Sequence, residues 1–289
     1  MLLKLIKFKL RSSKKNLILI CAGLLAFAVT FAISGNIVLS IALSEFDSLL
    51  TSLASLILTP IMLASLIGFS FASVAGYIVI AYSVYQTYGK SSAYLYFTLP
   101  ASRSNVYYAS VADAIIKVLI ISLASLVSIS FAMFTFSLNL NAAPIIEEIK
   151  DGSYYILKSL IPILSGDDNT FFSSFIFIIS CIVSGVVNLI YSAVLINFSC
   201  IFGCGMAKKH KMMGAILTGI ITSYAVSTIH SIVVSLPTFF FAISKTSVDI
   251  SALAYGSVST LIDAAFYAVM TIILNKMATS RLNKDFDVI

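Results

Sequence analysis

The sequence predicts an all-α, polytopic integral membrane protein with six transmembrane helices. Of its 289 residues, 60% are hydrophobic and only 10% are charged, whereas a soluble domain is about 45–50% apolar and about 25% charged. The apolar residues form six long runs, and each run holds at most one ionisable residue. This composition excludes soluble enzymes, DNA-binding domains and secreted disulfide scaffolds, because too little polar surface is available to cover a globule in water.

Each apolar run is long enough for one membrane span, since a helix needs about 20 mainly apolar residues to cross the hydrocarbon layer. The runs Leu49–Gln86 and Asn169–Ala207 are well over 30 residues long and could in principle hold a hairpin of two short helices. We expect a single tilted or protruding helix in each, because a hidden hairpin would reverse the sidedness of every later loop. The spans of this single transmembrane domain (1–289) are predicted at residues 17–43, 52–84, 110–138, 172–205, 213–243 and 252–276.

The charged residues predict the orientation. Most basic residues lie in the N-terminal segment, after the second span, after the fourth span and in the C-terminal tail. The alternate loops contain three basic residues, Lys150, Lys158 and Lys245, and most of the acidic ones. The positive-inside rule therefore predicts cytoplasmic N- and C-termini and an extracellular loop at 139–171. We expect no signal-peptide cleavage, because Leu17–Leu43 is longer than a typical signal-peptide apolar region.

Residues 2–15 have the pattern of an amphipathic interfacial helix on the inner leaflet. Apolar residues such as Leu3 and Ile6 share one side, and basic residues such as Lys4, Lys7 and Arg11 lie largely on another. This pattern predicts contact with membrane lipid. A basic segment that only sets the topology is the alternative.

Ionisable residues within spans are functional candidates by default. His230 lies close to the middle of the fifth span and Asp263 close to the middle of the sixth. A proton relay between them is one interpretation. In the other, each lines a wet cavity or is bonded to polar side chains of neighbouring helices, for which Asn188, Asn197 and Ser227 are candidates.

Asp113 and Lys117 form a second intramembrane candidate, near the inner end of the third span. They are four residues apart, so both lie on one face of a helix and can form an intrahelical ion pair. We interpret this pair as structural, with contact to a partner protein as the alternative.

The sequence lacks the motifs of nucleotide, metal and catalytic sites. The stretch Tyr88-Gly89-Lys90-Ser91 lacks the first glycine of a phosphate-binding loop, since Val84 stands at that position. The two histidines form no H-E-x-x-H motif, and the four cysteines lie within apolar runs as small buried side chains. We therefore expect no catalytic residue, no metal and no cofactor on this chain, and no nucleic-acid partner.

The segment 85–108 is the most unusual part of the chain, because eight of the 14 tyrosines fall between Tyr77 and Tyr108. It resembles the cytoplasmic loop between the second and third spans of bacterial ABC-2 type transporter permeases, which carries an aromatic residue and glycine, then Y-L-x-x-T-L-P, a small residue, S and R. The six spans, the basic amphipathic start and the length fit the same family. The matching residues are Tyr88, Gly89, Tyr94, Leu95, Thr98, Leu99, Pro100, Ser102 and Arg103.

This resemblance implies a non-enzymatic permease subunit of an ABC exporter in the bacterial cell membrane. It implies a dimer with an identical or homologous permease chain and two separate ABC ATPase subunits, which hold ATP and Mg and dock against the coupling loop 85–108. The apolar interior favours an antimicrobial peptide, a drug or a lipid-like molecule as cargo.

The local sequence of this loop predicts a helix, a sharp turn and a second helix. Pro100 disfavours helix at Leu99, and Ser102 is placed to cap a helix that runs through Arg103 and Asn105 into the third span. The alternative for the loop is a purely interfacial segment. For the whole protein, the alternatives are a proton-coupled secondary transporter that uses His230 and Asp263, and a non-transporting membrane immunity or sensor protein.

Overall fold

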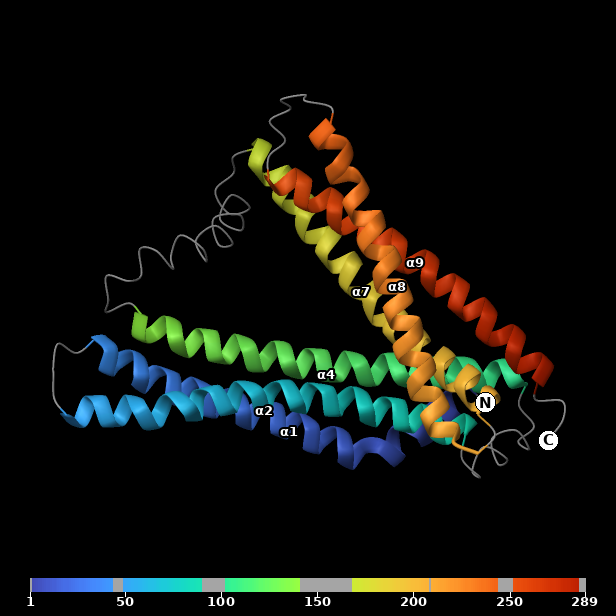
Figure 1. The fold of residues 1–289 in the computed structure, drawn as a ribbon, viewed down its shortest axis with the longest axis horizontal. Coiled ribbons are helices and arrows are strands. Elements are labelled where there is room, and N and C mark those ends of the chain that lie inside the picture. The colour runs from blue at the N-terminus through green and yellow to red at the C-terminus, as the bar shows by residue number, and fades with distance from the viewer. Residues whose placement is uncertain are drawn as a thin grey trace. The chain divides into compact units, whose positions relative to one another are not determined.

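The computed structural model describes residues 2–43, 49–89, 102–140, 168–207, 209–243 and 252–285. These residues form six helices, each of which contains a stretch long and apolar enough to cross a membrane (Figure 1). The predicted class, an all-α polytopic membrane protein, is therefore confirmed. The helices are α1 (Leu2–Leu43), α2 (Leu49–Tyr88), α4 (Arg103–Leu140), α7 (Asp168–Met206), α8 (Lys211–Ile243) and α9 (Ala252–Asp285).

The two longest apolar runs each form a single helix, as predicted. The helix α2 has 40 residues and α7 has 39, which at 1.5 Å per residue corresponds to about 60 Å, roughly twice the thickness of the hydrocarbon layer. Residues 2–15 are helical too. They form the first turns of α1, which continues to Leu43 without interruption, so the predicted N-terminal helix and the first span are one element.

The exposed faces of the helices are apolar, as expected for surfaces that contact lipid. On α8 the side chains of Ile220, Ile221 and Tyr224 are 61%, 66% and 76% exposed. Hydroxyl groups in the spans bond to carbonyls of their own helix, for example Ser34 to Thr30 at 2.7 Å. Because a bilayer offers no water to hydroxyls, this local pairing lets a serine-rich sequence remain in the hydrocarbon region.

The described residues form two compact units, and the division passes through α1, α2 and α4. The unit that contains Leu10–Ile80 also includes α4 from Ile116 onward. In this unit α1 buries a stripe of residues spaced three or four apart. Gly76 of α2 is buried beside it, and a Cβ added there would lie 2.8 Å from Ile121 Cδ1 and 3.5 Å from Ile20 Cγ2. The small residue therefore allows the three helices to approach. The buried α1 residues are Leu17, Ile20, Leu24, Ala28 and Ala32.

The other unit contains Ala81–Ile115, the start of α1 up to Lys9, and helices α7, α8 and α9. The helix α7 packs along both α8 and α9 (Figure 1). The helices α7 and α8 come close together at Gly203, where an added Cβ would meet backbone atoms of Gly214 and Ala215. Backbone atoms cannot rotate aside as a flexible side chain does, so this crossing requires glycine.

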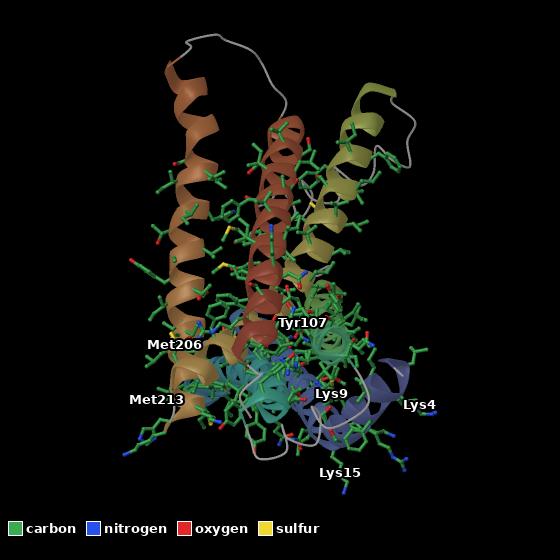
Figure 2. All side chains as sticks on the ribbon, turned by 90° about the vertical axis from the view of Figure 1, so that its right-hand side faces the viewer. Lys4, Lys9, Lys15, Tyr107, Met206 and Met213 are labelled. Atoms are coloured by element: carbon green, nitrogen blue, oxygen red, sulfur yellow. The ribbon has the colours of Figure 1, made fainter. Side chains whose placement is uncertain are left out.

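Several basic segments lie at one end of this second unit. Lys4 at the start of α1 lies at the same end as Met206 and Met213, which flank the turn between α7 and α8 (Figure 2). Hydrogen bonds described below bring the ends of α2 and α9 and the start of α4 to this end too. The prediction that these segments lie on the cytoplasmic side of the membrane is left to the labelling experiment below.

We predict that Gly203→Ala lowers the thermal unfolding midpoint of the purified protein, because the new Cβ collides with the α8 backbone. The matched control is Gly185→Ala in the same helix, where an added Cβ meets no atom within 4 Å. Since alanine is favoured over glycine by about 1 kcal/mol in a helix interior, the control should unfold at the same or a higher temperature. Equal midpoints for the two variants would contradict the close α7–α8 crossing.

The predicted topology is tested by the labelling of single cysteines in a cysteine-free background. Lys209→Cys lies in the exposed turn between α7 and α8, so a membrane-impermeant maleimide should label it only after the cells are opened. Lys158→Cys, in the predicted extracellular loop and outside the described residues, should be labelled in intact cells. The reverse pattern would show that the orientation is wrong.

Candidate functional site

The first candidate site consists of the helix ends that flank the segment 90–101. Of the residues that carry the family resemblance, Tyr88, Gly89, Ser102 and Arg103 are described by the structure. The helix α2 extends to Tyr88 and α4 begins at Arg103, so the predicted coupling loop 85–108 is helical at both of its ends. Tyr94, Leu95, Thr98, Leu99 and Pro100 lie outside the described residues.

Ser102 caps α4, as the sequence predicts. Its hydroxyl oxygen accepts a hydrogen bond from the backbone N–H of Asn105 at 3.3 Å. Its carbonyl accepts one from the N–H of Val106 at 3.2 Å. The side-chain bond satisfies a donor that a helix N-terminus otherwise leaves unpaired, and it fixes where the chain enters the helix.

Tyr88 attaches the end of α2 to α7. Its ring is buried, and its hydroxyl donates to Asn197 Oδ1 at 3.5 Å. Asn197 is fully buried, and its Nδ2 donates to the carbonyl of Ala193 at 2.9 Å. Two turns earlier on α2, the carbonyl of Ala81 lies 3.9 Å from the Cys200 thiol. The last two turns of α2 are therefore held against the buried face of α7.

Gly89 packs tightly at the same place. A Cβ there would meet the Tyr85 ring and would lie 2.8 Å from Cys204 Sγ on α7. Its backbone N–H donates to the Tyr85 carbonyl at 2.7 Å, which closes the last turn of α2. A larger side chain at this position would push the chain away from α7, so the glycine of the motif has a packing role.

Arg103 connects the other end of the segment to α9. Its Nη1 donates to the carbonyl of Asn283 at 3.4 Å, in the last turn of α9. A cation is favoured at that position, because the final carbonyls of a helix carry partial negative charge. Nearby, the Arg281 guanidinium lies 5.2 Å from the centre of the Phe202 ring, which joins the end of α9 to α7. The segment 90–101 is thus flanked by an α7 anchor and an α9 anchor.

The predicted candidates on α4 and α7 are placed as follows. Asp113 and Lys117 are both fully buried, with 1% and 0% exposure, and their intrahelical pairing stays a prediction. Asn188 is half-buried on α7, and its carbonyl accepts the Ser192 hydroxyl at 2.9 Å.

Lys9 of α1 is also buried. Sequence reasoning missed this, since Lys9 belongs to the same basic run as the exposed Lys4 and Lys15 (Figure 2).

The second candidate site is the pair His230 and Asp263. The His230 Nε2 and Asp263 Oδ1 atoms lie 2.8 Å apart and link α8 to α9. The two residues therefore contact each other directly, whereas Asn197, a candidate partner in the sequence, accepts the Tyr88 hydroxyl. A proton relay between His230 and Asp263 stays a prediction. The two side chains remain 23% and 28% exposed, so the pair is accessible from outside the bundle.

Aromatic rings surround this pair, and sequence reasoning did not identify them. The His230 ring stacks on Tyr267 with centroids 5.0 Å apart, and it lies 5.2 Å from Phe266. Tyr267 also contacts Tyr191 of α7, with centroids 4.8 Å apart. The i, i+3, i+4 spacing of Asp263, Phe266 and Tyr267 is the sequence signal that could have shown a shared helix face.

The residues in the described ranges hold no group of three or more His, Cys, Asp or Glu that could bind a metal ion. No protein-family model matches the chain, and no curated protein or solved structure matches it. A functional assignment therefore depends on the family resemblance of segment 85–108 and on the two sites described above.

We predict that Tyr88→Phe lowers the thermal stability of the purified protein, because it removes the buried hydroxyl that bonds to Asn197. The expected loss is about 1 kcal/mol, the usual net value of one hydrogen bond. Tyr77→Phe on the same helix is the control, since Tyr77 is 43% exposed, and its midpoint should not change. A Tyr88→Phe protein as stable as wild type would contradict the anchoring role of this bond.

Proposed function

We propose that the chain is the transmembrane permease subunit of an ATP-driven ABC exporter in the bacterial plasma membrane. Two such chains, identical or homologous, would form the substrate pathway. Separate ATPase subunits would dock against segment 85–108. The observation that carries the proposal is the anchoring of both ends of the motif-bearing segment, Tyr88 on α7 and Arg103 on α9.

This anchoring gives the segment a mechanical connection to the spans. The helices α2 and α4 run without interruption for 40 and 38 residues from the two ends of the segment. Packed helices move largely as rigid bodies, so a displacement at one end of α2 or α4 is carried along the helix. In the proposed cycle, ATP binding closes the ATPases, segment 85–108 moves with them, and the packing of the helices changes.

The chemistry of ATP hydrolysis is assigned to the partner. The chain lacks the first glycine of a phosphate-binding loop, so ATP and Mg²⁺ would be held by the ATPase subunits. The apolar interior supports an amphipathic or lipid-like cargo, such as an antimicrobial peptide or a drug. Transport by this chain alone would be inconsistent with the proposal.

The decisive experiment is co-purification of the tagged chain with the ATPase encoded beside it, followed by reconstitution in liposomes. We expect a stable complex and cargo movement that requires ATP and both subunits. Cargo movement by the permease chain alone would overturn the proposal. An extracellular location of residues 90–101 would overturn it too.

In that complex, Arg103→Ala should uncouple ATP hydrolysis from transport. The variant loses the hydrogen bond to Asn283 that joins the segment to α9. We expect ATP hydrolysis to persist while the transport rate falls about fivefold, which corresponds to about 1 kcal/mol for one hydrogen bond. Lys209→Ala, an exposed basic residue away from this contact, is the control and should transport normally. Parallel losses of both activities would show that Arg103 is needed for assembly and not for coupling.

A proton-coupled secondary transporter is the second candidate, and the 2.8 Å contact between His230 and Asp263 favours it. The variant Asp263→Asn distinguishes the two candidate functions. For the ABC exporter we expect ATP-driven transport to continue, with altered stability or cargo choice. For the proton-coupled transporter we expect transport driven by a pH gradient without ATPase, and its complete loss in the variant. A non-transporting immunity or sensor protein would give no flux under either condition.

A further inference from the structure

We propose that Asp263, together with the rings of Phe266 and Tyr267, forms a binding site for a monovalent lipophilic organic cation. The site lies where α7, α8 and α9 meet. The inference does not depend on the proposed function, because it concerns equilibrium binding to this chain.

The Asp263 carboxylate is the polar group of the proposed site. Asp263 lies within an apolar helix, where an ionised side chain is costly unless it meets a partner, a wet cavity or a ligand. In the structure, its Oδ1 lies 2.8 Å from Nε2 of His230. Because both side chains remain about a quarter exposed, a ligand can reach the carboxylate without opening the bundle.

Aromatic rings lie next to this carboxylate and form the apolar side of the proposed site. Phe266 and Tyr267 follow Asp263 by three and four residues, so all three side chains share one face of α9. Tyr191 of α7 is buried behind these side chains and packs against Tyr267, with ring centroids 4.8 Å apart. The faces of aromatic rings carry negative potential and attract organic cations. A carboxylate beside several rings therefore favours a cation with apolar or aromatic substituents.

No lysine or arginine of these three helices lies close enough to occupy the site. The described span of α7, Phe175–Met206, contains no charged residue. On α8 the nearest basic residue besides His230 is Lys211, more than five turns away, and on α9 it is Lys276, about 20 Å further along the helix axis.

Other ligand classes fit less well. An anion would be repelled by the carboxylate and by the ring faces. A metal ion needs several ligands, and the described residues hold no suitable group of three. A neutral apolar ligand would gain nothing from the carboxylate. The chemistry of the site thus selects for positive charge combined with apolar surface.

The test is equilibrium dialysis of the purified full-length chain, in nanodiscs of phosphatidylcholine, against tetraphenylphosphonium. Tetraphenylborate, an anion of matched size and shape, is the comparison ligand. We expect saturable binding of one cation per chain and only non-specific partition of the anion.

Variants locate the binding. Asp263→Asn should weaken tetraphenylphosphonium binding by about tenfold or more, and Tyr267→Leu by about threefold, in line with the strength of cation–π contacts in partly desolvated sites. Tyr224→Leu is the matched control, because Tyr224 is 76% exposed on α8, and it should bind like wild type. Each variant is first checked for unchanged elution and thermal midpoint.

Substitutions of His230 test the same site if Asp263→Asn does not fold. His230→Lys places a permanent cation beside Asp263 and should abolish binding, whereas His230→Gln keeps a neutral hydrogen-bond donor and should retain it. Equal binding of both ions overturns the proposal. So does wild-type affinity in a folded Asp263→Asn or His230→Lys protein, or the absence of saturable binding by wild type. The pair would then only join α8 to α9.

Discussion

The structure depends on one constraint, which is that polar backbone groups in an apolar solvent must find their partners within the chain. Helices satisfy this internally, which explains why the spans run without interruption for 33 to 42 residues. Side-chain hydroxyls follow the same rule, as in the bonds from Thr59 to Ser55 and from Ser199 to Leu195, at 2.8 and 2.7 Å. These hydroxyls are satisfied within their own helix and do not join it to a neighbour.

Two kinds of residue make the contacts between helices in the described part of the chain. One is the small residue, since Gly76 and Gly203 allow backbones to approach where a Cβ would collide. The other is a short set of polar side chains that reach another helix, of which Tyr88 with Asn197 and Thr260 with Ser180 are examples. In a membrane the hydrophobic effect does not drive helices together, so close packing and these bonds decide which helices are neighbours.

The two candidate sites use these contacts in different ways. At the end of α2 and the start of α4, hydrogen bonds from Tyr88 and Arg103 join these helix ends to α7 and α9. Such bonds suit the transmission of force, because they connect stiff helices at their ends. Around Asp263, by contrast, the polar group is partly exposed and bordered by rings. That arrangement suits the recognition of a ligand better than the transmission of force.

The sequence by itself determined the six apolar spans found in the described residues, their approximate positions and the Ser102 cap, because hydropathy and capping act over neighbouring residues. It did not locate the helix ends from hydropathy alone. Hydropathy placed the start of the third span near residue 110, but the helix begins at Arg103, where the cap allows it. Only the tertiary structure decided that His230 meets Asp263 and that Tyr88 meets Asn197. These partners are 33 and 109 positions apart, and their pairing depends on which helix faces pack together, which no local pattern encodes.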